Sequence, residues 1–456
     1  MNPAGAGKGK APEQAATGFP GLAARQAAAK LLGAVVDAKT PLDALTDQEH
    51  GHPAFRALDM RDRSLVRAIL VTALRFRGTV GRLISARLER PLPGNAHALV
   101  HVLHVAAAQI LFLDVPDSAA VDLAVTHAKS DPRTRRFAAL VNGVLRGMAR
   151  DKARTLPAEL AKGNEAPEWF RDRLEAAYGK EKSEAILAAH RIEAPVDFTV
   201  KSDPQKWAGA LAGMVLPTGS VRVERLAGPV SGLPSFAEGE WWVQDAAAAL
   251  PARMLGDTAG LDVADLCAAP GGKTAQLALA GARVTAVDMS GSRLKRFMEN
   301  LARLRLKATI VEADIAKWEP GKRFDAVLLD TPCSSTGTVR RHPDVPWTKS
   351  PDDVAKLAHL QAKLLAAACR FVKPGGRIVF SNCSLDPAEG ELLIAEFLAR
   401  NPDMRLSPLR PGEIAGADPF ITPRGALRTT PSDLDLGRPE ISGLDGFFAA
   451  RLVRTR

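Results

Sequence analysis

The residues in this sequence best suited to covalent chemistry are two cysteines, each of which follows shortly after an apolar run. Cys333 follows the run 324–329 and stands three residues after an acid, Asp330, and Cys383 follows the run 377–381. Cysteine is most often a small buried hydrophobic residue, and we assign that role to Cys369, which lies among leucines and alanines. Two cysteines at strand ends, one beside an acid, fit nucleophilic catalysis better. Simple packing remains the alternative for both.

A glycine-containing turn between an apolar strand and a helix forms a second candidate site. The strand 263–266 breaks at Pro270, Gly271 and Gly272, and a helix begins near residue 274. Glycines let a backbone approach a ligand closely, and a helix N-terminus offers free N–H groups. A second apolar strand ends at Asp288, where a carboxylate can accept hydrogen bonds from ribose hydroxyls. The pattern predicts a pocket for a nucleoside cofactor.

The turn also indicates which nucleoside cofactor fits. The dinucleotide pattern G-x-G-x-x-G is absent, because Ala268, Ala269 and Pro270 stand where a diphosphate would need glycine amides. A nucleoside without phosphates, as in S-adenosylmethionine, suits such a turn, and a nicotinamide-dependent dehydrogenase is disfavoured. The alternative is an ordinary strand-to-helix turn that binds no ligand.

Regular alternation of strands and helices after residue 240 positions these residues. The pattern predicts a helix over 246–255, strands near 262–266, 283–287, 308–312, 324–329, 377–381 and 447–453, and a long helix over 352–372 that 373–376 stops. Such alternation predicts a doubly wound, mostly parallel α/β sheet of the Rossmann-like type, with its site at the strand C-terminal ends. The fourth and fifth strands are neighbours in this fold, so the two cysteines should emerge side by side.

The first third of the chain is predicted to be helical and basic. Apolar residues recur at helical spacing in 23–36 and 98–113, and Asp62 is placed to cap another helix. Residues 21–150 hold 18 Lys/Arg against 11 Asp/Glu, and 15 of the 18 are arginines, which suit phosphates. With only 5% aromatic residues, backbone contacts to a nucleic acid are favoured over base stacking. A solvated basic face is the alternative.

Composition places the chain among soluble proteins and suggests four segments. The content is 46% hydrophobic and 25% charged, no apolar run is long enough to cross a bilayer, and the N-terminal segment lacks the apolar core of a signal peptide. We therefore expect a cytoplasmic protein without membrane association. The expected segments are a disordered tail (1–20), an all-α domain (21–150), linker helices with a small α+β subdomain (151–239) and the α/β domain (240–456).

Metal binding is not expected. The four cysteines show neither C-x-x-C nor histidine-ligand spacing, which disfavours zinc and a disulfide framework. His97, His101 and His104 lie near one helix face, but no carboxylate or cysteine is near them in sequence. Packing and surface roles are therefore favoured for these histidines.

Three short motifs resemble those of RNA 5-methylcytosine methyltransferases. They are Leu266-Cys267-Ala268-Ala269-Pro270-Gly271-Gly272-Lys273, Asp330-Thr331-Pro332-Cys333-Ser334 and Asn382-Cys383-Ser384. The segments 62–84 and 140–146 resemble the NusB-like RNA-binding domain that precedes the catalytic domain in the bacterial RsmB/Sun (Fmu) branch. The segments 340–344 and 445–448 also match that branch. The resemblance covers nearly the whole chain and implies a class I methyltransferase fold acting on 16S ribosomal RNA.

The resemblance assigns roles to the reacting residues. Cys383 is expected to add to C6 of cytosine, Cys333 to assist release, and Asp330 to hold the base edge near N3. S-adenosylmethionine is the implied cofactor. Its contacts carry over as Cys267, Ala268, Ala269, Pro270, Gly271, Gly272 and Lys273 for the methionine end, Asp288 for ribose, Asp314 for the adenine amine, and Asp330 closing the pocket. Arg293 is expected to help fix Asp288. Arg340 and Arg341, seven and eight residues past Cys333, are placed to grip phosphates flanking the target base, and two solvated arginines on a loop are the alternative.

Two departures from the family pattern leave these roles intact. Thr331 stands where the family usually has alanine, and Ser381-Asn382 replaces the more usual Ala/Ser-Thr, so only local substrate contacts are in doubt. We expect a monomer whose partner is RNA. Two alternatives remain open from the sequence, namely the same reaction on tRNA and a non-catalytic RNA-binding factor.

Overall fold

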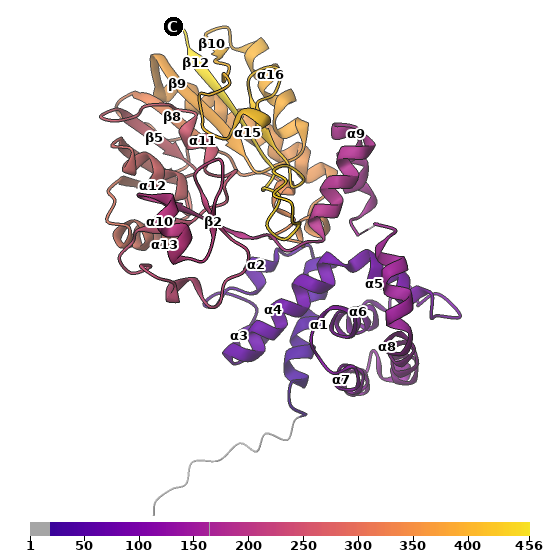
Figure 1. Cartoon of the computed structure of the whole chain (residues 1–456). Helices are drawn as coiled ribbons and strands as arrows, with labels where there is room; N and C mark the ends of the chain where they lie inside the picture. Colours follow the sequence, from indigo (N-terminus) through magenta and orange to yellow (C-terminus); the bar gives the residue numbers. More distant parts are fainter. Residues whose placement is uncertain (1–18, 164) are drawn as a thin grey trace, which may run out of the picture. The chain divides into compact units, whose positions relative to one another are not determined.

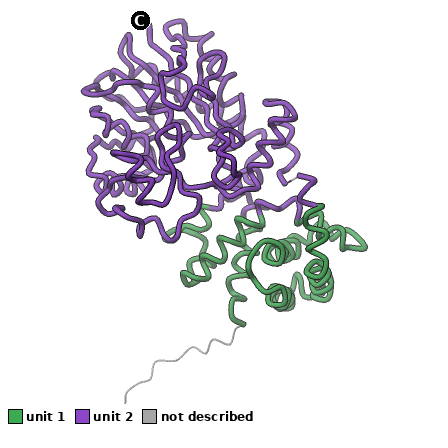
Figure 2. Tube along the Cα trace, in the orientation of Figure 1, with its two compact units in different colours: residues 1–34, 43–73, 80–158 green, residues 35–42, 74–79, 159–456 purple. Residues whose placement is uncertain are grey.

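The computed structural model describes residues 19–163 and 165–456, which form two compact units. The first, which we call the helical unit, comprises the described residues up to 34 together with 43–73 and 80–158; the second, the α/β unit, comprises 35–42, 74–79 and the described residues from 159 to 456 (Figure 2). The expected disordered tail over 1–20 lies, apart from Phe19 and Pro20, outside the described residues.

The helical unit is built around one apolar helix. Residues 99 and 101–111 of α6 are all buried, and α6 packs against α7. The principal helices are α1 (Leu22–Val36), α4 (Met60–Arg75), α5 (Arg77–Ser85), α6 (His97–Phe112), α7 (Asp117–Ser130) and α8 (Ala138–Leu160), of which α1, α4, α5 and α8 each run across a boundary of the unit (Figure 1). These positions confirm the predicted all-α region. Asp62, however, is not the cap of α4, because Asp59 precedes the helix and accepts the Asp62 N–H at 2.7 Å.

A small antiparallel sheet follows helix α9 (Glu168–His190) in the α/β unit. Its order is β2-β3-β1-β4, formed by β1 (Val196–Val200), β2 (Met214–Val215), β3 (Val221–Val223) and β4 (Trp241–Val243), with α10 (Pro204–Ala210) between β1 and β2. Phe198 and Trp241 pack edge to face in its core. The expected short strands and helix of this region are therefore present.

The main sheet positions the candidate site. It has eight strands, in the order β10-β12-β9-β8-β5-β6-β7 with β11 paired to β12, and β5 to β9 run parallel. The strands are β5 (Asp262–Leu266), β6 (Arg283–Asp288), β7 (Thr309–Glu312), β8 (Phe324–Asp330), β9 (Val372–Asn382), β10 (Met404–Leu406), β11 (Leu427–Thr429) and the antiparallel β12 (Phe447–Arg454). This arrangement confirms the predicted Rossmann-like fold.

Helices cover both faces of this sheet. One face is packed by α15 (Pro351–Phe371) and α16 (Glu391–Arg400), whereas α11 (Leu250–Arg253), α12 (Gly272–Leu279) and α13 (Gly291–Arg303) pack on the other (Figure 1). The central strands β5 and β8 are buried on both sides, which explains their near-continuous apolar runs. Because β5 to β9 run parallel, their C-terminal ends gather at one edge of the sheet.

Two local predictions were wrong. The helix expected over 246–255 is reduced to the four residues of α11, because Pro251 has no N–H with which to continue a helix from residue 246 and stands in the first turn of α11 instead. The segment 373–376, expected to lie between helix and strand, belongs to β9, where the register shifts between Phe324 and Ala326 of β8. No helix among residues 19–163 and 165–456 is long and apolar enough to span a bilayer.

Candidate active site

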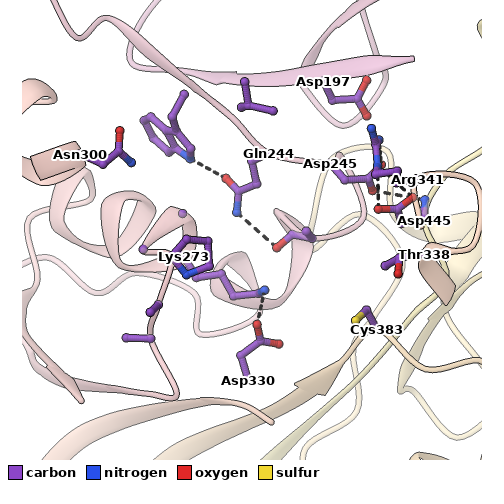
Figure 3. A pocket seen from close by; sticks show the side chains of 18 of the residues that line it. Asp197, Gln244, Asp245, Lys273, Asn300, Asp330, Thr338, Arg341, Cys383 and Asp445 are labelled. Atoms are coloured by element: carbon purple, nitrogen blue, oxygen red, sulfur yellow. Dashed lines mark hydrogen bonds and ion pairs between the residues drawn. The ribbon is translucent and has the colours of Figure 1, made fainter. Parts of the chain in front are cut away.

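A cavity of about 610 Å³ opens at the C-terminal edge of the main sheet (Figure 3). It is lined by the turn after β5, by residues 241–245 and by the ends of β8 and β9. All of the turn residues from Cys267 to Lys273 contribute to the lining, together with Asp330 and Cys383. The structure thus brings most of the predicted site residues into one cavity.

The turn after β5 is shaped for close approach of a ligand. Gly271 has a φ of 103°, and a Cβ atom there would lie 2.0 Å from the Phe297 ring, so only glycine fits. Cys267 also adopts a positive φ, of 61°, which is rare for a residue with a side chain and found at functional turns. The close packing of Gly271 against Phe297 of α13 therefore fixes the turn, whose residues line the cavity.

Asp265 is a site residue that the motif comparison did not single out. Its Oδ2 accepts the Thr274 hydroxyl, but its buried Oδ1 has no hydrogen-bond partner although the residue lines the cavity. Burial raises the pKa of Asp265 to about 7. An unpaired carboxylate oxygen beside a glycine cradle fits the charged methionine end of S-adenosylmethionine. Its signal in the sequence is an acid that interrupts the apolar run 263–266.

The two other acids expected at the cofactor lie outside the cavity lining. Asp288 is buried behind the turn, where its Oδ2 accepts the Ala269 N–H at 3.1 Å and lies 3.6 Å from the Arg293 guanidinium. Asp314 is exposed, and its Oδ1 accepts the Ala316 N–H. Asp288 thus supports the turn that faces the cavity. Contacts of Asp288 with ribose and of Asp314 with adenine stay predictions.

Asp330, the last residue of β8, is bonded both to the turn after β5 and to strand β9. Its Oδ2 accepts from Lys273 Nζ at 2.7 Å (Figure 3). Its Oδ1 accepts from the Ser381 hydroxyl at 2.8 Å. Ser381 is one of the departures from the family pattern, and its neighbour Asn382 donates to the Glu389 carbonyl oxygen. The departure at Ser381-Asn382 therefore bonds within the site and leaves the reacting groups in place.

The two cysteines lie in contact. Asp330 pairs with Ser381 in the parallel register of β8 and β9, which places the following turns side by side and brings Cys333 Sγ within 3.4 Å of Cys383 Sγ. The hydrogen bond with Cys383, together with burial, raises the pKa of the Cys333 thiol well above its ordinary value. Cys383 lines the cavity. The juxtaposition expected from the strand order is therefore observed.

The expectation that Arg340 and Arg341 grip phosphates was wrong. Arg340 is buried and donates to the Ser442 carbonyl, and Arg341 is paired with Asp245 at 2.7 Å and Asp445 at 3.0 Å. Both guanidinium groups are occupied by partners that lie about a hundred residues away in the sequence. They hold the segment that follows Cys333.

The segment 241–245 also contributes cavity residues that sequence reasoning missed. Gln244 accepts from Trp242 Nε1 at 2.8 Å and donates to Gln276 of α12 at 2.8 Å. Asn300 and Arg303 of α13 line the same part of the cavity. No group of histidines, cysteines or acids suited to a metal ion is found in the described parts of the chain, 19–163 and 165–456.

Comparisons with known proteins identify the family. The model of the 16S rRNA methyltransferase RsmB/F family matches residues 253–453, and that of the NusB family matches residues 22–150. Ribosomal RNA small subunit methyltransferase B of Klebsiella pneumoniae is 34% identical over 422 residues, covering 89% of this chain and 93% of that protein. The corresponding protein of Xanthomonas campestris is 36% identical, covering 96% and 99%.

The chain belongs to the RsmB/F methyltransferase family. Solved structures agree on the fold of this family member. The crystal structure of PH0851 is similar with a TM-score of 0.71 at 24% identity, covering 96% of this chain and 99% of that one. A methyltransferase homolog from Pyrococcus horikoshii is 28% identical with a TM-score of 0.53, covering 65% and 97%.

Proposed function

We propose that this family member methylates C5 of cytosine in 16S ribosomal RNA, with S-adenosylmethionine as methyl donor and a covalent adduct between Cys383 and C6. The observation that carries the proposal is the 3.4 Å contact between two thiols at the ends of neighbouring strands, beside Asp330 and the cavity. C5 and C6 are adjacent atoms of one ring, so two thiols that both act on this ring need to be neighbours, as Cys333 and Cys383 are. The name shared by the curated relatives supports ribosomal RNA of the small subunit as the substrate.

The chemistry explains why two thiols are needed. C5 of cytosine is a poor nucleophile, and addition of the Cys383 thiolate to C6 gives C5 the electron density of an enamine carbon. S-adenosylmethionine, when bound, supplies an electrophilic methyl group. Asp330 holds the base edge near N3, where a proton stabilises the charge that develops on addition. After methylation Cys333 assists release by taking the C5 proton as a thiolate. The electrons of the C5–H bond re-form the C5–C6 double bond, the bond between C6 and the Cys383 sulfur breaks, and Cys383 departs as thiolate.

The residues available for the cofactor are those of the turn. The segment 267–273 and Asp265 would hold its methionine end, and Asp288 would support the turn from behind. A base stacked in a duplex cannot offer C6 to a thiol, so the target must lie in a loop or be flipped out. We place the N-terminal residues 21–150 as an RNA-binding domain, since the NusB model matches them and they carry a net charge of +7.

Separate substitutions of the two cysteines test the mechanism. Cys383→Ala cannot form the adduct and should show neither methyl transfer nor covalently bound RNA. Cys333→Ala should attack and methylate but stall with RNA attached through Cys383. The test is a denaturing gel of each variant with S-adenosylmethionine and either a 16S rRNA or a tRNA transcript. A shifted band for Cys383→Ala alone would reverse the roles, and a band with tRNA only would replace the proposed substrate.

A further inference from the structure

Glu389 is a fully buried acid whose carboxylate is shared by the two cysteine turns. It ends the short helix η4 (Pro387–Glu389) and has no exposed surface. Its Oε1 accepts from the Ser334 N–H at 2.9 Å and from Gln361 Nε2 at 2.8 Å. Its Oε2 accepts from the Ser334 and Ser384 hydroxyls, both at 2.5 Å. Four donors therefore converge on one carboxylate.

These partners are the immediate neighbours of the reacting groups. Ser334 follows Cys333, and Ser384 follows Cys383 in the chain. Gln361 of α15 also donates to the Pro332 carbonyl at 3.0 Å, on the other side of Cys333. The two turns are further joined by the Gly337 N–H, which donates to the Cys383 carbonyl at 2.9 Å. Glu389 is thus the charged centre of the contacts between the turns.

A buried carboxylate needs such donors and at the same time fixes them. Burial raises the pKa of Glu389, while the hydrogen bonds from Ser334, Ser384 and Gln361 act in the opposite direction. Because a carboxylate only accepts hydrogen bonds, each serine hydroxyl must point its proton at Glu389. Charge-assisted hydrogen bonds of this kind are short and directional, so both turns are held at a fixed distance from the Glu389 carboxyl group.

We propose that Glu389 is a positioning residue that sets the separation of the Cys333 and Cys383 thiols. The proposal rests on the proposed function, in which both thiols serve one pyrimidine ring. A misplacement of about 1 Å in a reacting group can cost on the order of 100-fold in rate. Glu389 is fully buried and does not line the cavity, so it acts through the two serines.

The test measures the thiol separation without RNA or cofactor. The full chain is treated with diamide, which takes up two electrons and two protons as two thiols become a disulfide. Mass spectrometry of tryptic peptides then follows formation of the Cys333–Cys383 disulfide. Glu389→Gln keeps the shape but turns an N–H₂ group toward hydrogen-bond donors, and it should slow this cross-link by about tenfold or more. Glu413→Gln is the matched control, because its carboxylate pairs with Arg451 instead.

Two further variants cover the case in which Glu389→Gln does not fold. Ser334→Ala and Ser384→Ala each remove one hydroxyl from the shared carboxylate and should also slow the cross-link, with cooperative melting and S-adenosylmethionine affinity retained. Parental cross-linking rates in every folded variant would overturn the proposal, as would a parent chain that forms no cross-link. A parent that cross-links quickly but does not methylate cytosine would refute the proposed function and leave the positioning role standing.

Turnover gives a second readout that general destabilisation would not produce. In Glu389→Gln the kcat for methylation should fall. The KM for S-adenosylmethionine should stay at the parental value, because the turn 267–273 after β5 does not contact Glu389. A rise in that KM with unchanged kcat would contradict the positioning role.

Discussion

The arginines of the helical unit and those of the α/β unit differ in where their charge is used. Many arginines of the helical unit are exposed, namely Arg56, Arg61, Arg67, Arg90, Arg133, Arg135, Arg136, Arg146 and Arg150. In the α/β unit, by contrast, Arg222, Arg340 and Arg451 are buried and bonded to carboxylates or carbonyls. The same residue type thus serves as surface charge in one unit and as internal scaffold in the other.

This contrast shows when the net charge of a segment indicates a polyanionic partner. The net charge of +7 over residues 21–150 is carried largely by exposed side chains, so it indicates a polyanionic partner. The arginine pair 340–341 also suggests a polyanionic partner when only the sequence is considered. In the structure, however, both side chains are bonded to carbonyls and acids that are distant in sequence. Exposure, and not arginine content, decides which role a basic segment has.

The strongest destabilisation is expected when an internal pair is broken. Arg222 donates two hydrogen bonds of 2.7 Å to Asp197, and both side chains are buried. Arg222→Met leaves Asp197 without its cation and should lower the free energy of unfolding by about 3–5 kcal/mol, measured by urea denaturation. Adding Asp197→Leu should recover part of the loss. A decrease in the free energy of unfolding of less than about 1 kcal/mol would show that Arg222 does not stabilise the fold in this way.

A buried acid without a cation extends the contrast within the α/β unit. The pKa of Asp265 is raised to about 7 by burial, so the folded state binds its proton more tightly than the unfolded state. This contribution to stability is present below about pH 4 and is lost as the pH rises to about 7, amounting to roughly a few kcal/mol.

Asp265→Asn should therefore weaken the decline in unfolding free energy between pH 4 and 8. Denaturation of the parent and the variant across this range, without cofactor, is the measurement. An identical pH profile for the two proteins would mean that Asp265 keeps an ordinary pKa in the folded state.

The weakest effect on stability is expected in the helical unit. Replacing the exposed Arg135, Arg136 and Arg150 by alanine should change the unfolding free energy by about 0.5 kcal/mol or less per site. On the proposed RNA-binding role, the log–log salt slope of RNA affinity should fall by about 0.7 to 0.9 for each phosphate that the variant no longer neutralises. Arg400→Ala, at an exposed site of the α/β unit, is the control and should leave the slope unchanged.

The sequence was sufficient for the fold because periodicity is a local signal. The apolar runs predicted β5, β6, β8 and β12 to within one residue at each end. The order of these runs also placed Cys333 beside Cys383, since parallel neighbours end at the same edge. The prediction of a helix over 246–255 was wrong because Pro251, which has no N–H, confines the helix to the four residues of α11.

Residues whose role depends on long-range partners could not be found in the same way. Glu389 looks like an ordinary acid in the sequence, and only its buried surroundings distinguish it. Arg341 depends on Asp245 and Asp445, each about a hundred positions away. Until the spatial neighbours are known, an arginine that binds phosphate and one that binds internal carboxylates have the same pattern.

The place of β12 in the main sheet sets a condition on synthesis of the chain. This strand is made after all the others, yet it lies between β9 and β10 and is also the partner of β11. A nascent chain that ends before residue 447 therefore has two strands without a neighbour and lacks Phe447, which lines the cavity. Because domains form as synthesis proceeds from the N-terminus, a ribosome making this protein must translate β12 before the active-site wall can close.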